Sequence, residues 1–322
     1  MSRNTDDFPK TDKEFMRRFA NDDQACWEYL VQLRWPDGFV CPECGAGERN
    51  FIESRGLFVC ENGHQISVTA DTVMHRTHLP LSDWFIAAWH VTTQTPGMSS
   101  VVLARKLGIK QESAFTMLHR LRAGMVRPER ELLSGTVEVD ETFVNAGRLK
   151  EVRAGRGSGQ VIVVAAVEII DKYTGRVRLK AIESASEKNL MDFIQDNVAE
   201  GSMLVTDGWS GYRNAKDYGY GHHVVMGENS KEVAKNMPHI HNVFSNLKAW
   251  LIGTHHGVSS KHMPAYLNEF VFRYNRRGNP MRSFAALLGI SAASEGPEYE
   301  ELYSVGEEAG WVHPNPEEED DE

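Results

Sequence analysis

Apolar residues recur at helical spacing in the N-terminal third of the chain, between residues that break helices. A short amphipathic pattern covers residues 26–33, and its first residue, Cys26, is expected to be a packed core thiol. Residues 80–91 are also apolar at helical spacing, with Ser82 or Asp83 in position to cap the helix that they predict. Pro96 and Gly97 break the pattern, so this helix is expected to end before them.

Two shorter helices are predicted after this break. Ser99 or Ser100 is expected to cap the first, and Gly108 supplies the turn to the second. The inward positions of the second helix are apolar: Ala114, Met117, Leu118 and Leu121. The positions expected to point outward are basic: Lys110, Arg120 and Arg122. This rhythm is typical of a helix-turn-helix, whose second helix enters the major groove of DNA, although such hairpins also occur as plain packing units.

From residue 135 onward the pattern changes to that of strands. Residues 136–144 alternate between polar and apolar side chains, residues 161–170 are almost continuously apolar, and residues 176–182 alternate again. A helix is expected over residues 187–200 and a further strand over residues 202–207. Three strands, a helix and another strand are the order of a ribonuclease-H-like core.

Two helices are predicted after this core. Apolar residues at helical spacing cover residues 239–253 and 260–277. His241 and Lys248 lie seven positions apart in the first of these helices, so both side chains are expected on one face, two turns apart.

Composition is that of an ordinary globular protein. The chain has 322 residues, 41% of them hydrophobic and 25% charged, which is enough for two or three domains. No run of about 18 apolar residues predicts a membrane span, and no apolar segment near Met1 predicts a secretory signal. Four cysteines do not form a disulfide scaffold, so a reducing cytoplasm is the expected location.

Charge is unevenly distributed. The formal net charge is −10, but twelve acids and no Lys or Arg lie in residues 294–322, so the rest of the chain is about neutral. This terminus is expected to be a solvated, disordered tail, or else a polyanion that competes with nucleic acid. The body contains basic clusters of the kind that contact phosphates: residues 105–130 with Arg127 and Arg130, the glycine-rich loop 148–159, and residues 273–282.

Four residues predict a zinc ribbon. Cys41 and Cys44 form a CxxC turn, and Cys60 and His64 follow with three residues between them. Two such turns can place three thiolates and one imidazole around a tetrahedral ion, which is a closed structural site for Zn²⁺. The strand-like residues 51–59 lie between the two turns, as a ribbon requires.

Two acids on separate predicted strands suggest a second kind of metal site. Asp140 lies within one strand and Asp207 at the end of another, so adjacent strands could bring them together. Paired carboxylates favour a divalent cation, and oxygen ligands suit Mg²⁺ or Mn²⁺. Such ions can activate both oxygens of a phosphoryl displacement. Glu138 and Glu141 flank Asp140 and are expected on an exposed face or in structural hydrogen bonds.

The motifs together resemble the prokaryotic insertion-sequence transposases that combine an N-terminal zinc ribbon with a DDE-type, ISXO2-like catalytic domain. The resemblance runs from about residue 22 to residue 282. The segments that carry it are CPEC at 41–44, CENGHQISVTA at 60–70, MLHRLR at 117–122, VDET at 139–142, TDGWSGY at 206–212, SNLK at 245–248, GTHH at 253–256 and YLNEFVFRYNRR at 266–277.

This resemblance implies a transposase that hydrolyses phosphodiesters and transfers strands at the ends of an insertion sequence, with Mg²⁺ or Mn²⁺ held by Asp140 and Asp207. Lys248 matches the basic residue that follows the third acid of such sites by seven positions, and it is expected to hold a phosphate. Position 241 is a histidine rather than a glutamate, so His241 is the expected third ligand. Asn242, Asn246 and Glu269 remain alternatives.

The expected fold class is multidomain α/β, in which a zinc ribbon and a helix-turn-helix precede a ribonuclease-H-like mixed sheet. The expected divisions are a helical segment (1–38), the zinc ribbon (39–72), the helix-turn-helix region (78–127), the catalytic domain (133–290) and the acidic tail (294–322).

The implied partners are double-stranded DNA, both terminal repeats and target, and further copies of the chain on that DNA, without a membrane and in association with the nucleoid. A DNA-binding regulator that has lost its chemistry and a nuclease that cannot transfer strands are the alternative functions. A smaller departure from the group is Asp71, where glycine is common.

Overall fold

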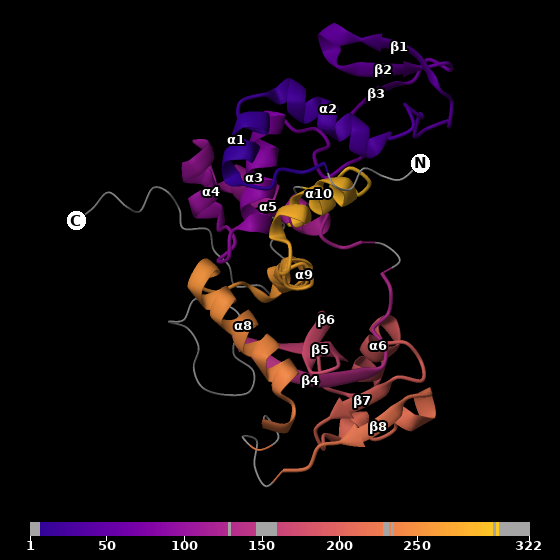
Figure 1. Cartoon of the computed structure of the whole chain (residues 1–322), viewed down its shortest axis with the longest axis vertical. Coiled ribbons are helices and arrows are strands. Elements are labelled where there is room, and N and C mark those ends of the chain that lie inside the picture. Colours follow the sequence, from indigo (N-terminus) through magenta and orange to yellow (C-terminus); the bar gives the residue numbers. More distant parts are fainter. Residues whose placement is uncertain are drawn as a thin grey trace, which may run out of the picture.

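The chain is arranged in successive regions along its long axis, with a small sheet at one end and a larger mixed sheet at the other (Figure 1). The computed structural model describes residues 7–127, 130–145, 160–227, 232, 235–298 and 301–302. The expected basic loop from Arg148 to Arg156 and most of the acidic tail lie outside these residues. None of the described helices combines the length and the apolar character needed to cross a membrane.

The small sheet follows two N-terminal helices. These helices are α1 (Asp12–Phe19) and α2 (Asp23–Arg34). The sheet consists of β1 (Glu48–Ile52), β2 (Leu57–Cys60) and β3 (Gln65–Ser67), antiparallel in that order. Cys26 is fully buried in the core of this region, as predicted from its pattern.

A helical layer lies next to the small sheet. It contains α3 (Leu81–Thr93), α4 (Ser100–Leu107) and α5 (Gln111–Ala123), joined by a late helix, α10 (Pro280–Ser291). Phe284 of α10 contacts aromatic rings from α1, α2 and α3, with the ring of Trp89 at 5.4 Å. No sequence pattern predicted α10, because its burial depends on helices about 195 to 270 positions earlier.

Three details of the helical layer test the predicted caps and faces. Ser99 caps α4 by accepting the N–H of Val102, and Gly108 ends that helix with a left-handed φ of 68°, both as predicted. The expected cap of α3 is wrong: the helix begins at Leu81, with Pro80 as the preceding extended residue and no side-chain cap.

The third detail is Arg122, whose expected exposure is also wrong, because its side chain is only 1% exposed. It follows Leu118 by four residues and therefore lies on the buried face of α5.

The mixed sheet has the order β6-β5-β4-β7-β8. Its strands are β4 (Thr136–Asn145), β5 (Gln160–Ile170), β6 (Tyr173–Ile182), β7 (Met203–Thr206) and β8 (Gly221–Val224). The first three are antiparallel, whereas β7 pairs parallel to β4 and β8 parallel to β7. This is the mixed sheet that the strand pattern predicts, extended by the unexpected edge strand β8.

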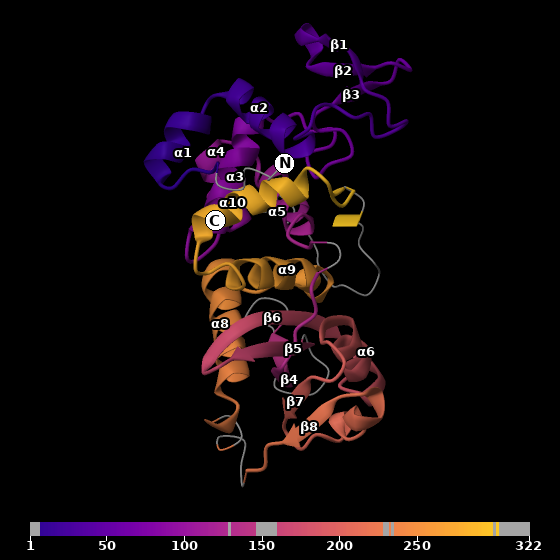
Figure 2. The ribbon, with the colours of Figure 1, turned by 45° about the vertical axis from the view of Figure 1, so that its right-hand side comes forward.

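Helices cover both faces of this sheet (Figure 2). One face packs against α6 (Glu187–Asn197), with Leu190, Phe193 and Ile194 buried on Val137, Val139 and Val164. The other face packs against α8 (Pro238–His255) and α9 (Met263–Tyr274), with Val243, Phe244 and Leu247 buried on Val163, Ala165 and Val167. Helix α9 also contacts α5, so it joins the sheet to the helical layer (Figure 1).

Candidate active site and metal centre

Asp140 lies on the central strand β4, and Asp207 directly follows the end of β7, the parallel strand beside it. Glu138 of β4 pairs with Val205 of β7, and each aspartate is two positions further along its strand direction. Side chains paired across parallel strands point to the same face, and side chains two positions apart share a face. The register therefore directs both aspartates toward the face that α8 covers, and Asp207 is near enough for its charge to raise the pKa of Asp140.

The environment of Asp140 opposes its ionisation. Its side chain is 14% exposed. Burial raises its pKa to about 7, and the carboxylates of Glu141 and Asp207 add to this effect, while the N–H of Glu141 and the ammonium of Lys248 oppose it. Asp207 is half-buried, and its Oδ1 accepts the N–H of Trp209 at 2.9 Å. A bound cation would remove the repulsion between the two carboxylates.

Helix α8 presents His241 and Lys248 to the same strand. His241 Nε2 is buried without a hydrogen-bond partner and lies 3.8 Å from Asp140 Oδ2. Burial lowers the pKa of His241, which favours the neutral imidazole and its free lone pair. Lys248 Nζ donates to Thr142 Oγ1 at 2.7 Å, two residues beyond Asp140, and burial lowers the pKa of this lysine as well.

Glu138 ties α8 to β4. The helix has no side-chain N-cap of its own, since Met237 precedes it and Pro238 begins it. Glu138 is 2% exposed, and its Oε2 accepts the N–H of Ile240 at 2.7 Å. The carboxylate of Glu138, a buried strand residue, thus takes the place of a side-chain cap. Glu138 lies two positions before Asp140 on β4, and its partner Ile240 lies one position before His241 on α8.

Glu141 and two further residues complete the surroundings. Glu141 Oε2 accepts the hydroxyl of Tyr212 at 2.6 Å, and burial raises the pKa of Glu141. Both Glu138 and Glu141 therefore make structural hydrogen bonds, one of the two roles expected for them. Thr142 and Tyr212 occur in the motifs quoted above, but their roles depend on partners 106 and 71 positions away, which the sequence does not reveal.

The alternatives to His241 lie elsewhere. Asn242 and Asn246 are exposed on other faces of α8. Glu269 is fully buried between α5 and α9, where its carboxylate accepts Arg122 Nε at 2.8 Å and lies 3.6 Å from Arg273 Nη1. These two arginines already partner Glu269, so its carboxylate belongs to the contact between helices.

The residues around Asp140 fit a divalent cation. Two ligands that each lie about 2.1 Å from one ion can be at most about 4.2 Å apart. The separation of 3.8 Å between His241 Nε2 and Asp140 Oδ2 falls within this limit. His241 and Asp140 could therefore share one cation, since the imidazole nitrogen has no hydrogen-bond partner in the described part of the chain.

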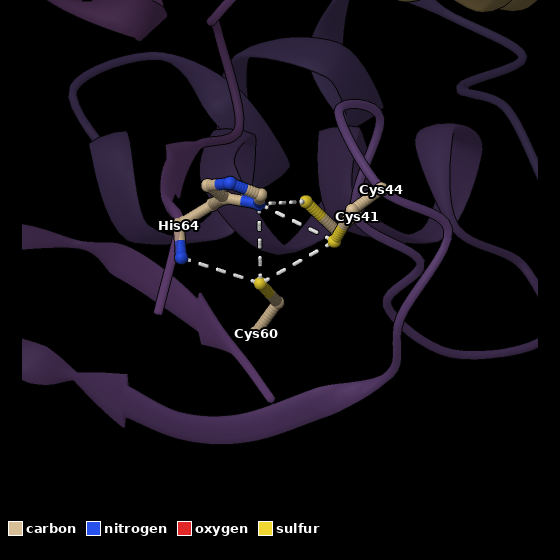
Figure 3. A group of neighbouring side chains, drawn as sticks. All are labelled: Cys41, Cys44, Cys60 and His64. Atoms are coloured by element: carbon tan, nitrogen blue, oxygen red, sulfur yellow. Dashed lines mark hydrogen bonds between the residues drawn. The ribbon is translucent and has the colours of Figure 1, made fainter. Parts of the chain in front are cut away.

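The four residues of the ribbon converge at the end of the small sheet, where Figure 3 shows the imidazole of His64 facing three sulfur atoms. A tetrahedral zinc ion requires separations of about 3.8 Å between sulfurs and about 3.6 Å between sulfur and nitrogen. Cys44 Sγ lies 3.7 Å from Cys60 Sγ, and His64 Nδ1 lies 3.3 to 3.6 Å from the three sulfurs. Cys41, Cys44, Cys60 and His64 therefore fit structural zinc.

Residues around the ribbon support it. Glu43 Oε2 lies 3.6 Å from His64 Nε2, the ring nitrogen that does not face the sulfurs, as carboxylates beside metal-bound histidines often do. Asp71 has a φ of 55°, a left-handed conformation that glycine adopts most easily.

Comparisons with known proteins agree with these features. A family model described as the ISXO2-like transposase domain matches residues 132–275, and another, described as the transposase zinc-ribbon domain, matches residues 21–63. An uncharacterized protein in transposable element ISH50 of Halobacterium salinarum is 23% identical over 278 residues, covering 80% of this chain and 92% of that protein.

Two solved structures are among the matches of the whole chain. The catalytic core domain of BIV integrase has a TM-score of 0.28 and 15% identity, covering 43% of this chain and 81% of its own. A pre-cleavage Mos1 transpososome has a TM-score of 0.28 and 12% identity, covering 61% of this chain and 75% of its own.

Proposed function

The chain belongs to the insertion-sequence transposases that carry an ISXO2-like catalytic domain and a zinc ribbon, and we propose that it cuts and joins DNA through divalent cations held by Asp140 and Asp207. The observation that carries this proposal is the register of β4 and β7, which brings both aspartates to one face beneath α8. His241 Nε2 points at Asp140 from that helix and is the proposed third ligand.

The proposed reaction has two displacements at phosphorus. In the first, a water adds to a phosphodiester at the element end and the bond to the 3′ oxygen breaks, leaving a 3′ hydroxyl and a 5′ phosphate. In the second, that hydroxyl attacks a phosphodiester of the target DNA and the bond to the target's 3′ oxygen breaks, so one phosphodiester replaces another and a target 3′ hydroxyl is released. Bound divalent cations, Mg²⁺ or Mn²⁺, supply Lewis acidity and neutralise the charge that develops on the phosphate oxygens.

The side chains contribute binding and orientation. Asp140 and Asp207 hold the cations. Because its pKa is about 7, Asp140 is partly protonated near neutral pH and must lose this proton when a cation binds. His241 donates its ring nitrogen as a neutral ligand. Lys248 lies beside Thr142 and Asp140 and is placed to contact a non-bridging phosphate oxygen. Glu138 positions the helix that carries both His241 and Lys248.

The remaining regions are proposed to bind the DNA. Lys110 at the start of α5 and Arg105 and Lys106 at the end of α4 are exposed on the helix pair, which supports a helix-turn-helix that reads terminal repeats with the zinc ribbon. The domain divisions drawn from the sequence are proposed unchanged, except that α10 belongs to the helical layer against which it packs. Several copies would act on paired DNA ends, in the cytoplasm and at the nucleoid.

The test is a cleavage and joining assay on the DNA that flanks the gene, with Mg²⁺, with Mn²⁺ and with neither. We expect Asp140→Asn and Asp207→Asn to abolish cleavage but to bind the ends as tightly as the unchanged chain. Asp171→Asn is the matched control, because this acid lies in the turn after β5 in a left-handed conformation that asparagine tolerates. Cleavage at an unchanged rate by either site variant would refute the assignment.

Substitutions at position 241, together with the joining assay, distinguish a transposase from a DNA-binding regulator and from a nuclease. If His241 is the third ligand, His241→Glu should retain or raise the Mg²⁺-dependent rate, whereas His241→Ala should lower it. A second candidate function, a DNA-binding regulator without chemistry, is favoured by the missing carboxylate at this position. A folded chain that binds the ends but cuts with neither cation would support the regulator, and cutting without joining would support a nuclease.

A further inference from the structure

A basic cavity lies at the junction between the helical layer and the mixed sheet. It has a volume of about 330 Å³ and is lined by Arg127, Arg130, Glu131, Arg178 and Asp196, among others. It lies near the start of β4, whereas Asp207 follows the end of the parallel strand β7. The cavity is therefore separate from the candidate active site.

The floor of the cavity is held by hydrogen bonds. Leu133 N–H donates to Asn197 O, and Ala199 N–H donates to Leu133 O, both at 2.8 Å. Arg178 is 6% exposed, and its guanidinium donates to Glu131 O at 2.9 Å and to Val177 O at 3.0 Å. Carbonyl oxygens thus orient this buried cation without neutralising it, because a carbonyl carries no net charge.

The two acids of the cavity are already paired with cations from outside it. Glu131 lies 3.0 Å from Arg176 Nη1, and Asp196 lies 3.4 Å from Lys180 Nζ. Arg127 and Arg130 are exposed, and neither of them, nor Arg178, forms an ion pair with a carboxylate in the described part of the chain. Positive charge therefore predominates among the described residues that line the cavity.

Neighbouring charges confirm that these cations repel one another. Burial and the charges of Arg130, Arg176 and Arg276 together lower the pKa of Arg178 to about 10, while Glu168 opposes the shift. Partial burial of its guanidinium also lowers the pKa of Arg130, although the residue as a whole is exposed. A bound anion would relieve both the burial cost and the repulsion, and the planar guanidinium group matches the oxygens of a phosphate.

We propose that this cavity binds a phosphate of the DNA backbone, contacted by Arg127, Arg130 and Arg178. The inference rests on the proposed function, since it takes DNA as the ligand. DNA is favoured over a free phosphate because Arg127 and Arg130 lie on the connector between α5 and β4 (Figure 1). These two arginines therefore lie between the helix pair and the catalytic sheet, the two regions that are proposed to contact the duplex.

The test measures binding of a labelled duplex from the element end by fluorescence anisotropy, without divalent cations, over a series of salt concentrations. Each phosphate contact contributes about 0.9 to the slope of log K against log salt. We expect Arg127→Gln and Arg130→Gln each to weaken binding several-fold, and the double variant to lose about one unit of slope, because both side chains contact one phosphate. Exposure of both arginines makes unfolding an improbable cause, and circular dichroism checks it.

The matched control is Lys188→Gln, which removes one exposed cation of α6 that is paired with Asp192. It should leave the slope unchanged. An unchanged slope in the double variant, or an equal loss in the control, would overturn the proposal. Thermal stabilisation by inorganic phosphate that the double variant lacks, together with an unchanged DNA slope, would assign the cavity to free phosphate and also overturn it.

Failure of this proposal and failure of the proposed function are distinguishable. The binding assay contains no divalent cation and requires no cleavage. A chain that cuts DNA but shows no slope change in the arginine variants loses only the cavity. A chain that never cuts but shows the slope change loses only the reaction.

Discussion

Replacing Asp140 with asparagine should stabilise the metal-free protein while it removes activity. Asp140 is largely buried beside Glu141 and Asp207, and this environment raises its pKa from 3.8 to about 7. At pH 8 the folded protein therefore carries a buried charge that the unfolded chain exposes to water. Asparagine has the same shape and no charge, and its side-chain oxygen can still accept the N–H of Glu141, now at 2.8 Å.

The size of the effect follows from the raised pKa. One unit of pKa difference corresponds to about 1.4 kcal/mol, so the rise from 3.8 to about 7 costs the folded state up to about 4 kcal/mol above pH 7. Between about pH 4 and pH 7 the folded protein keeps the proton that the unfolded chain has released. Stability conferred by the unchanged residue therefore falls as pH rises through this window. The stability of Asp140→Asn should not fall over this pH range. At pH 8 its free energy of unfolding should exceed that of the unchanged protein by about 2 to 4 kcal/mol.

The assay is hydrogen exchange of peptides from β4 and β5 in denaturant, with zinc retained and no Mg²⁺ added, since local exchange reports the opening of the catalytic sheet. Asp140→Asn and the control Asp171→Asn are compared with the unchanged chain at pH 4, 6 and 8, after correction for the intrinsic pH dependence of exchange. The gain of Asp140→Asn in the free energy of opening should be absent at pH 4 and reach its full size at pH 8. An equal gain at both pH values, or a loss at pH 8, would refute the electrostatic reasoning.

Two further substitutions test contacts between elements that are distant in the sequence. Glu138→Leu should lower the cleavage rate at least tenfold, because the N–H of Ile240 loses its acceptor. Glu138→Gln keeps an acceptor and should restore most of the rate. Equal cleavage rates in the two variants would contradict the positioning role of Glu138. Gly97→Ala should lower the free energy of unfolding by about 2 kcal/mol in urea titrations, because φ is 74° and the new methyl would lie 2.7 Å from Arg273 Nη1. Gly108→Ala is its control, since φ there is 68° but the space is open, so a smaller loss is expected.

The features that the sequence predicts are those set by nearby residues. Alternation of polar and apolar side chains identifies the long strands, and helical spacing identifies α3, α5, α6 and α8. The CxxC turn and the Cys-x3-His turn identify the ribbon, because each turn brings its own two ligands together. The order of strands and helix then limits the topology to a mixed sheet in which the strands of Asp140 and Asp207 are adjacent.

The features that the sequence does not predict depend on distant partners. Arg122 is buried because Glu269, 147 positions later, accepts its Nε. Glu138 becomes a helix cap only because α8, 102 positions later, begins beside it. Strand β8 has four residues, two of them histidines, which is too short and too polar a segment to show a strand pattern. No local pattern of side chains contains these contacts.

The imidazole at position 241 is consistent with the charge balance of the site. Asp140 already has a raised pKa with Asp207 and Glu141 nearby, so a third carboxylate as close as His241 Nε2, at 3.8 Å, would raise the cost of the metal-free fold further. A neutral ligand avoids that cost but attracts a cation less strongly than a carboxylate does. Nitrogen ligands suit Mn²⁺ better than Mg²⁺. As the proposed third ligand, His241 would therefore have a lower affinity for Mg²⁺ than a carboxylate but a smaller cost to the metal-free fold, and the cation that supports the faster reaction should be Mn²⁺.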